Sequence, residues 1–141
     1  MINIVFEGPT GAGKTTTIKQ LVEKYAKKYK VGYTNDIDES TPLYPIINGM
    51  FQENVLVSLK EEFNTVRYET LVQAADYLYL REKLYSQNND INFFDRNYFS
   101  IFSYQSVLAN EAIEDSEKFM NFVLECMKHG EKGIDLLVFF E

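Results

Sequence analysis

I-N-I-V-F-E-G-P-T-G-A-G-K-T-T-T, at residues 2–17, places an apolar run, a glycine-rich loop and a helix start in direct succession. The run Ile2–Phe6 is short and rich in β-formers, which is typical of a buried strand. Gly8–Thr15 then match the spacing G-x-x-x-x-G-K-[ST], and apolar residues recur at helical spacing from Ile18 to Tyr29. Because this motif requires a strand before it and a helix after it, the context predicts a phosphate-binding loop.

The loop has the residue types that phosphate binding needs. Glycine backbones reach positive φ and let the chain approach an anion closely, while successive N–H groups and the helix N-terminus attract negative charge. Lys14 would reach the β- and γ-phosphates, and the Thr15 hydroxyl would ligate Mg²⁺. The residues expected to bind the phosphates of ATP are Gly8, Gly11, Ala12, Gly13, Lys14, Thr15 and Thr16.

A second polar pair, Asp95-Arg96, follows the apolar run at residues 91–94. Ligands of parallel sheets bind outside the carboxyl ends of the strands, so Asp95 should face the same crevice as Lys14. Asp95 is expected to hold Mg²⁺ directly or through water, and Arg96 to present a planar fork to a second anionic group. An alternative is that the two side chains simply pair with each other. The expected catalytic residues are Lys14, Asp95 and Arg96, and the expected metal ligands are Thr15 and Asp95.

Strands and helices are expected to alternate along the chain. The expected strands cover residues 2–6, 31–34, 91–94 and 134–140, and the expected helices follow the glycine loop and cover residues 42–63, 66–84, 98–108 and 116–130. Alternation of this kind predicts an α/β fold with a parallel sheet between two helical layers, in one domain over residues 1–141.

Composition limits the partners. The net charge of −7 argues against general nucleic-acid binding, which needs a basic surface. No apolar run approaches the roughly 20 residues that cross a bilayer, so no membrane partner and a cytoplasmic location are expected. The single cysteine excludes an intramolecular disulfide.

Three stretches resemble the thymidylate kinase branch of the P-loop nucleoside and nucleotide kinases. The opening I-V-F-E-G-P-T-G-A-G-K-T-T at residues 4–16 is similar to the start of that family. D-R-N-Y-F-S-I-F-S-Y-Q at residues 95–105 is similar to its signature D-R-Y-x-x-S-x-x-A-Y-Q, and A-A-D at residues 74–76 resembles the helix that carries A-A-D-R. The resemblance spans essentially the whole chain.

The resemblance implies transfer of the ATP γ-phosphoryl group to a nucleoside monophosphate. It places Arg96 on the acceptor phosphate and Tyr104 near the sugar, where a ring disfavours a 2′-hydroxyl. The residues that it places around the acceptor are Asp36, Gln73, Tyr77, Arg96, Ser100, Tyr104 and Gln105. The family tends to dimerise through helices, so a homodimer is also compatible.

Several positions depart from the family pattern. Thr10 stands where the family has an acid in the loop, Gln73 replaces a base-stacking phenylalanine, and Tyr77 replaces the arginine of A-A-D-R. These changes predict an altered base preference. Relatives also continue after the strand near Glu141 into an arginine-bearing lid and a further strand, so the chain is expected to correspond to the N-terminal part of a longer kinase fold or to a truncated relative.

Two other functions are compatible with the same residues. In a deoxynucleoside kinase, Asp36 would be the general base for a sugar hydroxyl and Gln73 would hydrogen-bond the base edge. In an ATP-binding module without catalysis, only the loop would be functional.

Overall fold

The computed structural model describes residues 1–35, 38–52 and 66–141. The elements in chain order are β1 (Ile2–Glu7), α1 (Lys14–Tyr25), β2 (Val31–Thr34), α2 (Tyr44–Gln52), α4 (Val66–Ser86), β3 (Ile91–Asp95), α5 (Tyr98–Ala112), α6 (Ser116–His129) and β4 (Leu136–Phe139). The expected alternation of strands and helices is confirmed. The helix expected over residues 42–63 is observed as α2, and residues 53–63 lie outside the described part.

The chain divides into two compact units. The first comprises Met1–Asp38, Leu80–Asn97 and Glu131–Glu141, and the second comprises Glu39–Tyr79 and Tyr98–Gly130. All four strands belong to the first unit. α4 passes from one unit to the other: its C-terminal turns, from Leu80 on, belong to the first unit, and its N-terminal turns belong to the second.

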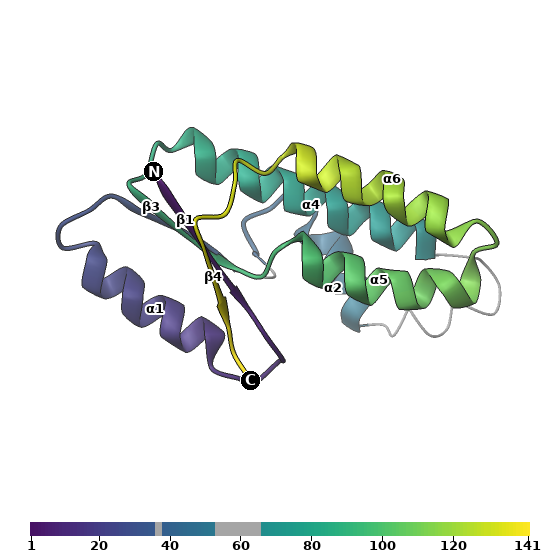
Figure 1. Ribbon diagram of the computed structural model, residues 1–141, viewed down its shortest axis with the longest axis horizontal. Coiled ribbons are helices and arrows are strands. Elements are labelled where there is room, and N and C mark those ends of the chain that lie inside the picture. Colours follow the sequence, from purple (N-terminus) through teal and green to yellow (C-terminus); the bar gives the residue numbers. More distant parts are fainter. Residues whose placement is uncertain (36–37, 53–65) are drawn as a thin grey trace. The chain divides into compact units, whose positions relative to one another are not determined.

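The sheet of the first unit is parallel throughout, in the order β2-β3-β1-β4, and Figure 1 labels β1, β3 and β4. The inner strands β1 and β3 pair from Ile2 with Ile91 to Phe6 with Asp95. This register brings the end of β1, where the glycine loop starts, next to the end of β3, where Asp95 and Arg96 follow. The predicted α/β class with a parallel sheet is therefore confirmed.

Alternate residues of the inner strands face two different helices. Phe6 and Phe93 pack in one cluster with Ile18 of α1, which runs along one side of the sheet (Figure 1). On the opposite face, Val5 and Phe94 pack with Leu84 and Tyr85, from the C-terminal turns of α4. The two-residue period of a strand thus sends neighbouring side chains into separate cores, and the expected three layers are present within this unit.

β4 is an edge strand, although its sequence is as apolar as that of the inner strands. It pairs only with β1 in the described structure, and Leu136 and Phe139 are 52% and 71% exposed. Continuous apolar runs mark inner and edge strands alike, so the place of β4 in the sheet could not be read from its composition.

The second unit is helical in its described residues. Figure 1 shows α5 and α6 packed alongside each other. One cluster of the unit contains Val66, Ala109, Ile113 and Met120, and another contains Ala74, Tyr77, Val123 and Met127. Among the described helices of both units, none has the length and apolar character that crossing a bilayer requires.

Three asparagine side chains, those of Asn3, Asn89 and Asn92, form a buried amide ladder at the end of the sheet away from the glycine loop. Asn89 Nδ2 donates to Asn92 Oδ1 at 3.0 Å, and Asn92 Nδ2 donates to Asn3 Oδ1 at 3.0 Å. Asn3 Nδ2 in turn donates to the carbonyl of Gly133 at 3.0 Å. Buried amides are tolerated because they satisfy one another. A Cβ at Gly32 would lie 2.1 Å from Asn89 Nδ2 and 2.7 Å from Asn92 Oδ1.

Gly32→Ala is therefore expected to lower the free energy of unfolding by about 2 kcal/mol, because the added methyl group displaces the ladder in a packed interior. The measurement is urea denaturation of the purified chain. Gly49→Ala in α2 is the matched control, since a Cβ there meets no described atom within 4 Å and alanine is the better helix former. Equal midpoints for Gly32→Ala and the wild type would contradict the account.

Candidate functional site

The loop between β1 and α1 is built on three glycines with positive φ. Gly8, Gly11 and Gly13 have φ of 136°, 84° and 88°. At Gly8 a Cβ would also lie only 2.5 Å from the carbonyl oxygen of Phe140. Gly13 is the N-cap of α1 and has no side chain with which to cap the helix. The first N–H groups of α1 therefore lie next to the loop, where they can bind an anion.

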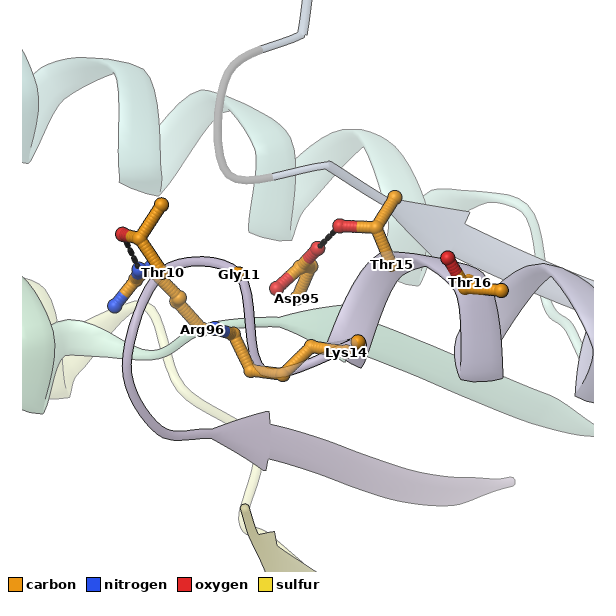
Figure 2. A pocket seen from close by; sticks show the side chains of 8 residues that line it. Thr10, Gly11, Lys14, Thr15, Thr16, Asp95 and Arg96 are labelled. Carbon is orange, nitrogen blue, oxygen red and sulfur yellow. Dashed lines mark hydrogen bonds between the residues drawn. The ribbon is translucent and has the colours of Figure 1, made fainter. Parts of the chain in front are cut away.

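Lys14 is the buried cation of this loop. Its side chain is 6% exposed, and Nζ donates to the carbonyl oxygens of Gly8 at 2.9 Å and Pro9 at 2.8 Å. These carbonyls hold the ammonium group at the loop, and Figure 2 shows the Lys14 side chain lying beside it. A buried ammonium group needs such partners, and phosphate oxygens could replace them.

Thr15 and Asp95, the two residues expected to hold Mg²⁺, are in direct contact. Thr15 Oγ1 donates to Asp95 Oδ2 at 2.6 Å (Figure 2). The other carboxylate oxygen of Asp95, Oδ1, is buried and has no hydrogen-bond partner among the described residues. A buried carboxylate oxygen without a partner costs free energy unless a cation or water satisfies it. The pair fits Mg²⁺, which takes oxygen ligands and shares its shell with phosphates and water.

Arg96 has a backbone conformation that is uncommon for a residue with a Cβ. Its φ is 75°, and its N–H donates to the carbonyl of Phe6 at 2.9 Å. From this position Nη2 donates to Thr10 Oγ1 at 3.1 Å (Figure 2). Non-glycine residues with positive φ occur preferentially where the surrounding structure enforces them, often at functional sites. Arg96 therefore contacts the glycine loop through Thr10.

These side chains line one cavity of about 320 Å³ in the first unit. Its walls are Thr10, Gly11, Gly13, Lys14, Thr15, Thr16, Asp95 and Arg96. The cavity is of the size of a small-ligand site. It collects a cation, a pair of oxygen ligands and a guanidinium group, which together suit phosphate groups.

The negative charge of Asp95 also affects Tyr33, which lies near the end of β2. Burial raises the pKa of the Tyr33 hydroxyl, and the negative charges of Asp95 and Asp38 raise it further. Tyr33 therefore stays protonated near neutral pH, and its hydroxyl donates to Asn35 Oδ1. Asp36, the base expected for a deoxynucleoside kinase, lies outside the described residues.

Two buried residues at this site escaped the sequence analysis. Glu7 is 4% exposed at the end of β1, and its Oε1 accepts a hydrogen bond from the backbone N–H of Asn97 at 2.8 Å. Arg81 is 2% exposed on α4, and its Nη2 donates to the carbonyl of Arg96 at 3.2 Å. No signal in the sequence singles out Arg81, because it is one of three consecutive charged residues between Leu80 and Leu84.

The remaining expected acceptor residues belong to the second unit. Tyr77 is buried in its core and packs edge to face against Tyr98. Gln105 is 2% exposed, and its Oε1 accepts a hydrogen bond from Thr70 Oγ1 at 2.8 Å. Tyr104 is 73% exposed. Gln73 and Ser100 are half-buried. Within this unit, the side chains of Tyr77 and Gln105 are thus engaged in packing and hydrogen bonding.

Comparison with known proteins identifies solved structures that share the fold of this chain. No family model and no curated protein sequence matches the chain. Among solved structures, thymidylate kinase from Ehrlichia chaffeensis matches with a TM-score of 0.67 and 22% identity, over 99% of this chain and 71% of that one. The chain has the fold of a nucleotide kinase.

Two further structures share this kinase fold. Thymidylate kinase from Candida albicans matches with a TM-score of 0.64 and 21% identity, over 99% of this chain and 62% of that one. Deoxyadenosine kinase from M. mycoides with bound dATP matches with a TM-score of 0.65 and 15% identity, over 98% and 64%. The chain spans between 62% and 71% of the length of these kinases. At such identities the likeness establishes the fold alone.

Lys14→Ala is expected to weaken ATP binding by roughly 100-fold, because it removes a buried cation that would pair with phosphate. The measurement is calorimetric titration of the chain with ATP and Mg²⁺. Lys19→Ala, on the exposed side of α1, is the control and should bind as the wild type does. Unchanged affinity in Lys14→Ala would refute the assignment of the loop as the ATP site.

Proposed function

We propose that this protein binds ATP with Mg²⁺ and transfers the γ-phosphoryl group to the phosphate of a nucleoside monophosphate. The observation that carries the proposal is that Lys14, the Thr15–Asp95 pair and Arg96 line one cavity. The kinase fold supports it, since the matched structures include two thymidylate kinases.

On the donor side, the loop would bind the triphosphate. Lys14 would exchange the carbonyls of Gly8 and Pro9 for phosphate oxygens, and the N–H groups at the start of α1 would add further donors. Thr15 and Asp95 would hold Mg²⁺, and the Oδ1 of Asp95, which has no hydrogen-bond partner within the described residues, would be available to the ion or to one of its waters. When bound, Mg²⁺ supplies neutralisation of the charge that develops on the phosphate oxygens.

On the acceptor side, Arg96 would bind the acceptor phosphate. A guanidinium group offers two parallel N–H donors to a phosphate, and Thr10 holds this group against the loop at 3.1 Å. Catalysis would then consist of aligning two phosphates and neutralising their charge, with no covalent intermediate on the protein. The substitutions at Thr10 and Gln73 support a base preference that differs from that of thymidylate kinases.

A deoxynucleoside kinase is the second candidate. The match to deoxyadenosine kinase has a TM-score of 0.65, comparable to those of the thymidylate kinases. In this case the acceptor is a sugar hydroxyl and Asp36 would be its base. The two candidates differ in whether the acceptor already carries a phosphate.

A panel assay separates the candidates. ATP consumption is measured with deoxynucleosides, ribonucleosides and their monophosphates as acceptors, on this chain and on any longer natural form. Turnover with monophosphates supports the proposal, and turnover with nucleosides alone transfers the assignment to the second candidate. ATP binding without turnover in the longer form would contradict both kinase candidates and indicate a nucleotide-binding module without catalysis.

Asp95→Asn is expected to raise the Mg²⁺ concentration needed for half-maximal ATP binding by roughly tenfold or more, because an amide is a weaker ligand for Mg²⁺ or its water than a carboxylate. ATP binding in the presence of a chelator should change little. The measurement is ATP titration at a series of Mg²⁺ concentrations. An unchanged Mg²⁺ requirement would remove Asp95 from the metal site.

Arg96→Ala is expected to raise KM for the monophosphate by roughly thirtyfold or more and KM for ATP only slightly, because a clamp on the acceptor phosphate is lost. Arg67→Ala is the control, since Arg67 is an exposed arginine on α4. The measurement is initial-rate kinetics with each substrate varied in turn. Equal losses for both substrates would show that Arg96 does not discriminate acceptor from donor.

A further inference from the structure

Arg81 is the centre of a buried network in the first unit. Its Nε donates to Glu131 Oε2 at 3.1 Å, and the two side chains are 3% and 8% exposed. The guanidinium group also lies 3.7 Å from the centroid of the Phe94 ring. A guanidinium group is buried only when charge and hydrogen bonds compensate it, and here a carboxylate and an aromatic face do so.

Tyr85 fixes the carboxylate that holds Arg81. Its hydroxyl donates to Glu131 Oε1 and accepts a hydrogen bond from the backbone N–H of Lys132 at 3.3 Å. Burial, together with the bond to Glu131, raises the pKa of Tyr85 far above its usual range, so that the hydroxyl remains a donor. The guanidinium group of Arg81 is therefore held on several sides.

The network reaches the site through the backbone of Arg96. Arg81 Nη2 donates to the Arg96 carbonyl at 3.2 Å, and the Arg96 N–H donates to the Phe6 carbonyl at 2.9 Å. The two peptide groups that flank the Arg96 Cα are thus both held while its φ is 75°. Since this conformation is unfavourable for a residue with a Cβ, the surrounding contacts must maintain it.

We propose that Arg81 is a positioning residue, which keeps Arg96 in its left-handed conformation and so aims the Arg96 side chain across the loop at Thr10 and the acceptor phosphate. The inference rests on the proposed function for the identity of the acceptor. Relaxation of Arg96 to an ordinary φ would change the direction in which its Cβ leaves the backbone, and the 3.1 Å contact with Thr10 would be lost.

The geometry explains why the residue is an arginine. Its planar fork donates from Nε to Glu131 and from Nη2 to Arg96 at the same time, whereas a lysine has one nitrogen on a flexible stem. Arg81→Lys therefore keeps the charge and removes the geometry. Arg81→Met removes both the charge and the geometry, but it also removes the cation that faces the buried Glu131 carboxylate. The double variant Arg81→Met/Glu131→Gln neutralises both members of the pair at once and avoids this imbalance.

The first test is kinetic. Arg81→Lys and Arg81→Met/Glu131→Gln are expected to raise KM for the monophosphate about tenfold and to change KM for ATP less than about twofold. The reason is that a misplaced Arg96 would lose a charge-assisted hydrogen bond to the acceptor phosphate, while the ATP loop is unchanged. Arg67→Lys and Arg67→Met, on the exposed part of the same helix, are matched controls and should behave as the wild type does. A parallel rise in both KM values would overturn the proposal, because it would indicate a general structural defect.

A double-variant cycle tests whether Arg81 acts through Arg96. When Arg96→Ala is already present, adding Arg81→Lys should cause no further loss in kcat/KM for the acceptor, because the side chain to be aimed is gone. Losses that multiply in full would show that Arg81 acts independently of Arg96.

The second test needs no turnover. Amide hydrogen exchange at Arg96 should become about tenfold faster in both Arg81 variants, since the backbone bond to Phe6 would open more often. The amide of Thr17, which donates to the Gly13 carbonyl in α1, serves as the internal reference and should not change. Unaltered exchange at Arg96 would overturn the positioning role. If the wild type fails the panel assay, the proposed function falls, and the exchange result still decides the role of Arg81.

Discussion

Parallel pairing between β1 and β3 is the constraint on which the rest of the first unit depends. Because Phe6 stands beside Asp95 in the register, the loop that leaves one strand and the polar pair that leaves the other emerge at the same edge of the sheet. The contact between Thr15 and Asp95, and the bond from the Arg96 N–H to Phe6, both need this register. A shift by one residue would turn Asp95 toward the opposite face. The apolar packing of Phe93 and Phe94 on opposite faces holds the register in place.

The same edge holds the least favourable backbone of the site. Gly8 has φ of 136° and a Phe140 carbonyl 2.5 Å from where a Cβ would stand, and Arg96 has φ of 75° despite its Cβ. Glycine meets the first requirement at little cost. The second is met by hydrogen bonds from outside the loop, to Phe6 and from Arg81. The left-handed backbone of Arg96 would be unfavourable in isolation. Sheet pairing and the buried network around Arg81 stabilise it in the folded chain.

Sequence reasoning reached the parts of this structure that local patterns encode. The strand, glycine loop and helix at residues 2–25, the parallel α/β class, and the position of Asp95 at a strand end follow from periodicity and motif spacing. Edge placement of β4, burial of Tyr77 against Tyr98, and the bond between Gln105 and Thr70 do not. Each of these depends on which distant segment packs alongside, and period and composition carry no such information. Arg81 and Glu131 are fifty residues apart, so only the folded chain shows that one compensates the other.

In the proposed function, a single loop position, Thr10, bears on how the acceptor phosphate is bound. Its hydroxyl accepts a hydrogen bond from Arg96 Nη2 at 3.1 Å, and this partner is neutral. A carboxylate at the same position would bind a guanidinium group through two parallel hydrogen bonds and a full opposite charge, which an incoming acceptor phosphate would then have to displace. In the proposed function, the hydroxyl would therefore orient Arg96 with less competition for its charge than a carboxylate. Thr10 contacts the Arg96 side chain from the loop, Arg81 bonds to its carbonyl from the sheet side, and Arg96 lines the cavity that also contains Lys14.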